Sequence, residues 1–376
     1  MLKLAIKNGF YRPARTFLTV LAVAAILAEI LMLEGFMSGT YTQLRKSVLE
    51  RGGDVIVAQT GISNFIAARS VLPQQVRAEV EAQPGVAEAH PLTSLMLIYE
   101  AGGRLSPILV VVYDDAGGPA AVTEGRAPQG TGEITIDRAL ARRYGLAIGD
   151  KLTLSAYDFT ITGITEGAAA IFTPFAFVTF DGLIDFYFES DVGADIAAFP
   201  LLSFLLVDVT PGADPAEVAA TIDANIPDAD TFLPETLATN DENLGRELFG
   251  PILSLLLGLS YAIGALAIGL FSFAAVRSRK KTLGVLRALG FTTRHLMAGV
   301  VIEALFTALL AIPLGVAMAS GLATLIENIS PVYLIETGNP VGLWRTGAIA
   351  VLLAILGGLA PLGTMRRLDP ATAFRG

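Results

Sequence analysis

The chain has 376 residues, of which 53% are hydrophobic and 16% are charged, a composition that is apolar for a soluble protein. It contains no cysteine, which excludes disulfides, thiol chemistry and cysteine-ligated metal sites. The net charge is −9, and such an acidic balance disfavours nucleic acid as a partner.

The charge is distributed unevenly along the chain. The stretch from Ser38 to Leu248 holds 12 basic and 29 acidic residues. Residues 1–15 and the segment Arg277–Arg294 carry basic residues and no acid. Because loops rich in Lys and Arg stay in the cytoplasm, this split predicts basic segments inside and an acidic domain outside.

The first 50 residues predict a membrane anchor. Residues 1–15 are basic and partly apolar, which indicates an interfacial helix on the inner leaflet. Residues 16–50 predict a first span that continues outward as a stalk and ends before Gly52-Gly53. The span is longer than a signal-peptide core and no small-x-small cleavage site follows it, so we expect it to stay uncleaved.

Residues 51–235 predict a water-soluble α+β domain on the extracytoplasmic side. Helices are expected from Pro73 to the Pro84-Gly85 break and after Asp214-Pro215. Gly149-Asp150 is expected to be a hairpin turn. Strands are expected in the segments DVIVA, SPILVVVYD, AAAIFTPFAFVTF and LLSFLLVDV. The segment GEITIDRALARRYGLAIGDKLTLSAYDFTITGITEG is expected to fold as strand, helix, turn, strand and strand.

The remaining chain predicts three further spans. Residues 236–276 form a second stalk and span, 277–295 a cytoplasmic loop, and 296–325 a third span kinked at Pro313. An acidic outer loop, 326–345, ends in Trp344 and Arg345 as interface anchors, and 346–376 form the fourth span and a cytoplasmic C-terminus. We therefore predict an α-helical membrane protein with four transmembrane helices and a large α+β domain between the first two. Both termini would be cytoplasmic.

The loop 277–295 predicts a short amphipathic helix. Leu283, Leu286 and Leu289 recur at near-helical spacing among six basic residues. Such an apolar stripe needs a cover, which could be lipid or a soluble partner. The alternative is an ordinary positive-inside loop.

Acidic residues inside the spans are the sharpest local signal. Glu29 lies roughly 20 Å into the first span and Glu303 roughly 10 Å into the third, at about 1.5 Å per residue. A charge at such depth costs several kcal/mol unless it faces protein or water. Glu29 could face a cavity between two protomers, or could hold one span against another. For Glu303 a structural or coupling role is favoured. Small residues in spans two to four permit close helix contact, within one protomer or between two.

No motif for catalysis stands out. The chain has no Gly-x-x-x-x-Gly-Lys-Ser/Thr phosphate loop and no Gly-x-Ser-x-Gly elbow. His90 and His295 are predicted on opposite sides of the membrane, so we expect no paired-histidine metal site. We expect no catalytic or metal-binding residues, no cofactor in this chain, and an energy source in another subunit.

Three segments resemble the FtsX-like permease family, the four-span ABC transporter subunits that include MacB, LolC/LolE and DevC. They are LAIKNGFYRPARTFLTVLAV, RSRKKTLGVLRALGFTTRHLMAGVVIEAL and MRRLDPATAFRG. The resemblance implies that Leu283, Leu286, Arg287, Leu289 and Gly290 form a coupling helix that docks on a cytoplasmic ATPase, which would hold ATP and Mg²⁺. The family often has an acid where this chain has Thr282, so a contact through that acid is in doubt.

The resemblance further implies a second permease copy, in a homodimer or heterodimer, and mechanotransmission from the ATPase to the outer domain. The location implied is the inner membrane, and the cargo a lipid, lipoprotein or other amphiphile. A weak likeness to DevC implies a periplasmic adaptor protein. Two alternatives remain: a non-transporting subunit that signals to an extracytoplasmic hydrolase or sensor, and a membrane-anchored binding protein without an ATPase.

Overall fold

A computed structural model describes residues 13–66, 69–101, 104–167, 169–170, 173–190 and 201–366. The chain divides into two compact units. The helical unit comprises Met1–Ser38, Gly250–Leu325 and Ile335–Gly376. The strand-rich unit comprises Gly39–Phe249 and Ile326–Leu334. The interfacial helix predicted for residues 1–15 lies outside the described residues, apart from the last three, which begin the first long helix.

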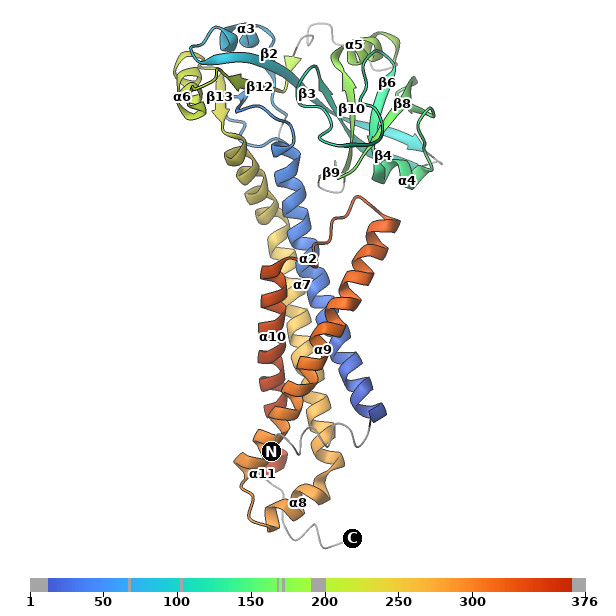
Figure 1. Cartoon of the computed structure of the whole chain (residues 1–376), viewed down its shortest axis with the longest axis vertical. Helices are drawn as coiled ribbons and strands as arrows, with labels where there is room; N and C mark the ends of the chain where they lie inside the picture. The colour runs from blue at the N-terminus through green and yellow to red at the C-terminus, as the bar shows by residue number, and fades with distance from the viewer. Residues whose placement is uncertain are drawn as a thin grey trace. The chain divides into compact units, whose positions relative to one another are not determined.

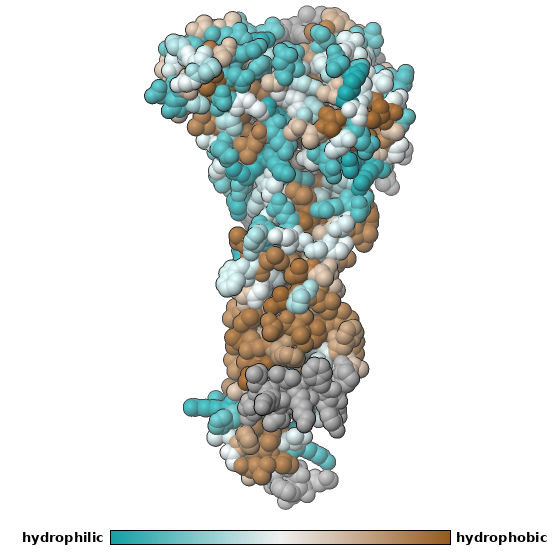
Figure 2. All heavy atoms as spheres, viewed as in Figure 1, coloured by the Kyte–Doolittle hydropathy of each residue, from teal (hydrophilic) through white to brown (hydrophobic). Residues whose placement is uncertain are grey.

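Four helices are long and apolar enough to cross a membrane (Figure 1). They are α2 (Pro13–Leu49), α7 (Pro234–Ser278), α9 (Thr293–Ile329) and α10 (Pro340–Leu359), and two short helices, α8 (Lys280–Ala288) and α11 (Leu362–Arg366), follow α7 and α10. At 45 residues α7 is about 68 Å long, roughly twice the hydrocarbon thickness of a bilayer. On the face shown in Figure 2, apolar side chains form a continuous band around the helical unit.

The helices of the helical unit pack closely at glycines. A Cβ added to Gly315 of α9 would lie 3.0 Å from the Ala24 carbonyl oxygen of α2. A Cβ on Gly357 of α10 would lie 2.9 Å from the Gly269 amide nitrogen of α7. Small residues therefore hold these spans together within one protomer. The buried core between the helices consists of Val20, Val23, Ala24, Leu27, Ile30, Leu257, Ile268, Ala311, Ala350 and Leu353.

The strand-rich unit contains one large mixed sheet with the strand order β13-β1-β12-β3-β4-β10-β6-β8-β5. β4 pairs with β10, and β6 with β8, in parallel, whereas the other pairings on this path are antiparallel. β7 pairs with β8, β9 with β10, and β2 with β11. The strands are β1 (Val55–Gln59), β2 (Leu72–Pro73), β3 (Val86–Ala101), β4 (Arg104–Tyr113), β5 (Val122–Gly125), β6 (Glu133–Asp137), β7 (Lys151–Leu154), β8 (Tyr157–Thr165), β9 (Ala169–Ala170), β10 (Thr173–Thr179), β11 (Leu201–Leu202), β12 (Phe204–Val209) and β13 (Ala229–Phe232).

Two hydrophobic cores are joined by the long strand β3 (Figure 1). Its first half contributes Ala89 to a core covered by α3 (Gln75–Glu81) and α6 (Pro215–Asn225). Its second half contributes Tyr99 to a core covered by α4 (Arg138–Tyr144) and α5 (Phe180–Glu189). A single 16-residue strand therefore makes the two cores parts of one sheet.

Inside the strand-rich unit, the end of α2 and the start of α7 form a two-helix stalk. Arg45 of α2 makes ion pairs with Glu235 and Glu242 of α7, at 2.5 and 3.4 Å. The Arg246 guanidinium lies 4.4 Å from the centre of the Tyr41 ring. These charge-assisted contacts fix the two helices side by side.

The next turn of chain anchors the stalk to the sheet. Arg51 is only 3% exposed, and its Nη1 donates to the carbonyl oxygens of Gly117 and Gly118 at 2.9 and 2.8 Å. Its guanidinium lies 5.0 Å from the centre of the Phe177 ring on β10. Burial lowers the pKa of Arg51 to about 10.

The predicted fold class is confirmed: four apolar helices, with a sizeable α+β domain between the first and second. Some details were wrong. Pro73 belongs to strand β2 and α3 begins at Gln75, because Pro73 pairs with Leu201, which is distant in sequence. Strand β3 and helix α5 were not predicted.

Two helices begin before the residues at which the spans were predicted to start. Helix α9 begins at Thr293, next to Thr292, whose hydroxyl accepts from the His295 amide, and the third span was predicted from residue 296. The fourth begins at Pro340 rather than residue 346, because the Asn339 side chain caps the helix by accepting from the Val341 amide. Trp344 therefore lies inside the first turns of α10 rather than in a loop.

Candidate functional site around the short basic helix

The basic segment after α7 does form a separate helix, α8, and a glycine ends it. Gly290 has a φ of +94°, which favours glycine. The Gly290 amide donates to the Arg287 carbonyl at 3.0 Å, and the Phe291 amide donates to the Leu286 carbonyl at 3.1 Å. This is a Schellman arrangement, in which the chain reverses and leads into α9. Gly290 therefore has a structural reason to be glycine.

One side of α8 packs on the rest of the helical unit. Leu283 and Leu286, three residues apart, are partly buried on the same face of the helix. They contact a small core made of Val276, Leu296, Met297 and Met365, with Val300 and Leu362 at its edge. This core ties α8 to the end of α7, the start of α9 and the short helix α11.

Arg287 strengthens the same attachment. Its Nη1 donates to the carbonyl oxygens of Met365 and Arg366 at 3.1 and 3.4 Å. These carbonyls are among the last of α11, where helix geometry leaves acceptors without a partner inside the helix. A cation there is also favoured by the helix dipole. Arg287 thus joins α8 to the described end of the chain.

The other side of α8 is apolar and exposed. Val285 and Leu289, four residues apart, are 43% and 72% exposed, and Phe291 lies just beyond them. Exposed apolar residues grouped in this way indicate a contact surface. Of the five predicted coupling residues, Leu283, Leu286 and Arg287 contact the chain itself, whereas Leu289 and Gly290 are exposed.

An ion pair lies next to α8. Arg279, at the junction of α7 and α8, donates through Nη1 to the Glu303 carboxylate of α9 at 2.8 Å. Each side chain is little more than one-quarter exposed. Because both charges lie close to apolar helix surface, each one lowers the cost of placing the other there. Glu303, singled out from the sequence, is thus paired with a residue of the basic segment.

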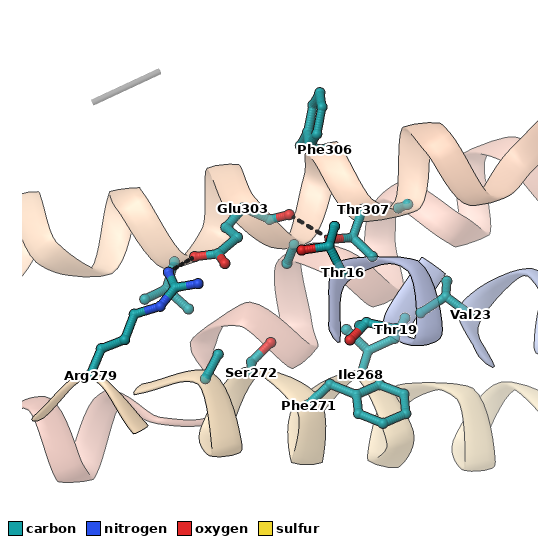
Figure 3. Close-up of a pocket in the computed structure, with 14 residues that line it drawn as sticks. Thr16, Thr19, Val23, Ile268, Phe271, Ser272, Arg279, Glu303, Phe306 and Thr307 are labelled. Atoms are coloured by element: carbon teal, nitrogen blue, oxygen red, sulfur yellow. Dashed lines mark hydrogen bonds and ion pairs between the residues drawn. The ribbon is translucent and has the colours of Figure 1, made fainter. Parts of the chain in front are cut away.

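The ion pair forms one wall of a cavity of about 70 Å³ between α2, α7 and α9 (Figure 3). Hydroxyl groups of Thr16 and Thr19 on α2 and Ser272 on α7 also line it, and the other walls are largely apolar. The cavity holds one carboxylate and one guanidinium that neutralise each other. This arrangement suits a structural or switching role better than bond chemistry, because the carboxylate is already engaged.

Glu29 lies at an exposed position of α2 in the isolated chain. Its Oε1 is 3.0 Å from the Ser260 hydroxyl of α7, which also lies 3.0 Å from the Leu256 carbonyl oxygen. The contact with Ser260 joins α2 to α7, and the role of Glu29 between two spans stays a prediction. Its exposure leaves the second prediction, a cavity between two protomers, open.

Glu34 is a further acidic residue of α2. It is only 4% exposed, and its Oε1 accepts a hydrogen bond from the Tyr261 hydroxyl at 3.0 Å. Its Oε2 is buried and, among the described residues, has no hydrogen-bond partner. The direction in which Glu34 points depends on how α2 is rotated against its neighbours.

The strand-rich unit holds one group of potential metal ligands among the described residues. Glu88, His90 and Asp115 place ligand atoms within 4.8 Å of one another. The His90 Nε2 also lies 3.2 Å from an Asp208 carboxylate oxygen. The pKa of the neighbouring Asp114 is raised, first by burial and then by Asp115 and Asp181. Glu88 and His90 lie two residues apart on β3, but Asp115 lies in the loop after β4, and the sequence does not show that the fold brings this loop beside them.

Two family models match the chain. Residues 16–225 match the MacB-like periplasmic core domain, and residues 254–370 match the FtsX-like permease C-terminal domain. The second match contains α8, the Glu303 position and the described end of the chain.

Relatives match over the full length of the chain. An uncharacterized ABC transporter permease of Mycobacterium tuberculosis (strain ATCC 25618 / H37Rv) is 27% identical over 379 residues, covering 100% of both chains. An uncharacterized ABC transporter permease of Mycobacterium bovis (strain ATCC BAA-935 / AF2122/97) is 24% identical, also over 100% of both chains.

Two solved structures align with part of the chain. The periplasmic region of MacB from Actinobacillus actinomycetemcomitans has a TM-score of 0.36 at 10% identity, covering 52% of this chain and 96% of that one. The extracellular domain of the noncanonic ABC-type transporter YknZ from Gram-positive bacteria has a TM-score of 0.35 at 9% identity, covering 48% of this chain and 100% of that one.

Proposed function

The chain belongs to the ABC transporter permeases of the MacB/FtsX type, and on that premise we propose that α8 couples it to ATP hydrolysis in a separate cytoplasmic ATPase. Permeases of this class work with an ATPase and are not enzymes themselves. The protein is therefore an inner-membrane subunit whose energy comes from its partner.

The exposed apolar face of α8 is the observation that carries this proposal. Leu289 and Val285 form a small exposed apolar patch on α8. Leu283 and Leu286 pack the opposite face of α8 against the rest of the helical unit. A docking helix needs both properties, because a push at its outer face must move the spans and not only the helix. Basic residues around it favour the cytoplasmic side of the membrane.

A path for the movement follows from the elements that contact α8. The ion pair between Arg279 and Glu303 links the start of α8 to α9, and α7 leads directly into α8. Helices α2 and α7 are each continuous from the helical unit to the stalk, where Arg45 and Arg51 fix them to their surroundings. In mechanotransmission, these two continuous helices would transmit movement from α8 to the outer domain.

The proposed assembly contains further partners. A second permease copy would cover part of the apolar surface around Glu29 and give that carboxylate a protein environment. The cargo that we propose is an amphiphile such as a lipid or lipoprotein, handled at the outer unit. ATP and Mg²⁺ would bind the ATPase, and an adaptor protein would complete an export route.

Purification of the full chain with its native partners tests the proposal. ATP hydrolysis should copurify with the chain in nanodiscs, and candidate lipids or lipoproteins should change its rate. Hydrolysis that no amphiphile alters, together with binding of a cell-wall hydrolase or sensor, would favour the signalling alternative. Copurification without any nucleotide hydrolysis would contradict coupling and favour a membrane-anchored binding protein.

A further inference from the structure

A second cavity of the helical unit lies between α9 and the segment formed by α10 and α11. Its volume is about 570 Å³, which is much larger than the cavity beside Glu303. Most of its walls are apolar, and two arginines, Arg294 and Arg366, stand at its rim with Thr293. The apolar lining consists of Met297, Ala298, Val301, Ile355, Leu359 and Leu362.

The two arginines lie at helix ends that share one side of the membrane. Arg294 is in the first turn of α9, and Arg366 is the last residue of α11. Neither takes part in an ion pair with a described carboxylate, in contrast to Arg279, Arg45 and other arginines of the chain. Two cations therefore face a groove without a described counter-charge, next to the amides of a helix N-terminus.

We propose that this groove binds one anionic phospholipid. The phosphate would contact the two guanidinium groups, which are well suited to phosphate oxygens. An acyl chain would lie along Met297, Val301 and Ile355. Basic pockets between spans at the cytoplasmic surface are a known physical solution for anionic headgroups. A soluble phosphate would leave the apolar part of the groove unfilled, so the combined chemistry favours a lipid.

The groove shares residues with the attachment of α8. Met297 and Leu362 line the groove and also contribute to the small core that holds Leu283 and Leu286. Arg366 lines the groove, and its carbonyl accepts from Arg287 of α8. A bound lipid would brace the base of α8. This inference goes beyond the proposed function, and binding can be measured without any ATPase.

Native mass spectrometry of the full chain in detergent tests the site. Phosphatidylglycerol and phosphatidylcholine would be titrated separately, and the retained molecules counted. We expect the wild-type chain to retain phosphatidylglycerol in preference. The double variant Arg294→Gln/Arg366→Gln should weaken that binding by about 25-fold, because each arginine near a lipid phosphate contributes about a factor of five.

A matched control removes the same charge outside the groove. Arg277→Gln/Lys280→Gln lies in the same basic segment, at exposed positions, and should retain the lipid as wild type does. Ala298→Trp, which fills the groove and keeps both arginines, should reduce retention. Melting without lipid verifies that each variant is folded. Equal loss in the two double variants would overturn the proposal, as would full retention in the first or complete displacement by inorganic phosphate.

Discussion

Among single residues, the pair of Arg279 and Glu303 joins the predicted coupling segment to a span. Removal of one partner leaves the other charge in a mostly apolar setting, and removal of both does not. Arg279→Gln and Glu303→Gln should each lower stability by about 1–2 kcal/mol, because both side chains keep some contact with solvent. The double variant should cost less than the sum.

Thermal or denaturant unfolding in nanodiscs measures this double-mutant cycle. Arg277→Gln serves as the control, since Arg277 is exposed on the neighbouring turn. Additive losses in the double variant would show that the two residues act independently.

Arg51 offers a second test at this scale, in the strand-rich unit. Arg51→Gln would remove the cation that both glycine carbonyls accept from, and should cost about 2 kcal/mol. A pKa of about 10 lies below the ordinary value for arginine, so the folded state loses this proton at lower pH than the unfolded state. Loss of the Arg51 proton would then raise the free energy of unfolding only as the pH rises above about 10.

The loss in Arg51→Gln should therefore be the same at pH 6 and pH 9, as measured by urea unfolding. Arg143→Gln, at an exposed position, is the control. A loss that shrinks markedly by pH 9 would mean that Arg51 releases its proton well below pH 10.

Among the elements, close helix packing depends on glycine at particular places. In Gly357→Val, the Cβ would lie 2.6 Å from Ile268 Cγ2 and 2.9 Å from the Gly269 nitrogen, so α10 and α7 must separate. We expect a loss of about 1–3 kcal/mol from overpacking. Gly347→Ala in the same helix meets no atom within 4 Å and should be neutral or slightly stabilising.

Sequence patterns predicted some of the helices and strands and missed others. The spacing of Leu283, Leu286 and Leu289 predicted a helix, and α8 is one. Spacing alone did not show which face of α8 packs on α9 and α11 and which face is exposed. The difference depends on neighbours that are distant in sequence. Strand β3 was missed since it contains Pro91 and polar residues that interrupt simple alternation.

The same reason explains the acidic residues of α2. The helical rise per residue gave the depth of Glu29, but the directions of Glu29 and Glu34 follow from the packing of α2 on α7 and α10. Glu34 is buried beside Tyr261, and Glu29 is exposed. The start of α10 could have been predicted from the sequence, because Asn339-Pro340 is a usual helix start. The predicted start at residue 346 followed the apolar run instead.

For the whole molecule, the stalk is expected to carry movement. Arg45→Glu would face Glu235 and Glu242 with a like charge and should cost about 1–2 kcal/mol at the stalk. Since the chain has no cysteine, Phe188→Cys, at an exposed position, can carry a single spin label in each of the two copies that we propose. ATP should change the label distance in wild type and change it less in Arg45→Glu.

The charge-reversed variant Arg45→Glu/Glu235→Arg/Glu242→Arg should restore the response, which separates loss of the ion pairs from general damage. An unchanged response in Arg45→Glu would exclude these contacts from the path.

The measurement that tests the central claim most directly is ATP hydrolysis that copurifies with Leu289→Asp. Leu289 is 72% exposed, so the variant should fold and melt as wild type does. Ile148→Asp, an exposed apolar residue of the strand-rich unit, is the matched control. The account predicts that copurified hydrolysis falls at least about tenfold in Leu289→Asp, as for an interface hot spot, and is unchanged in Ile148→Asp. Wild-type hydrolysis and full retention of the ATPase in Leu289→Asp would contradict the claim that α8 is the docking helix.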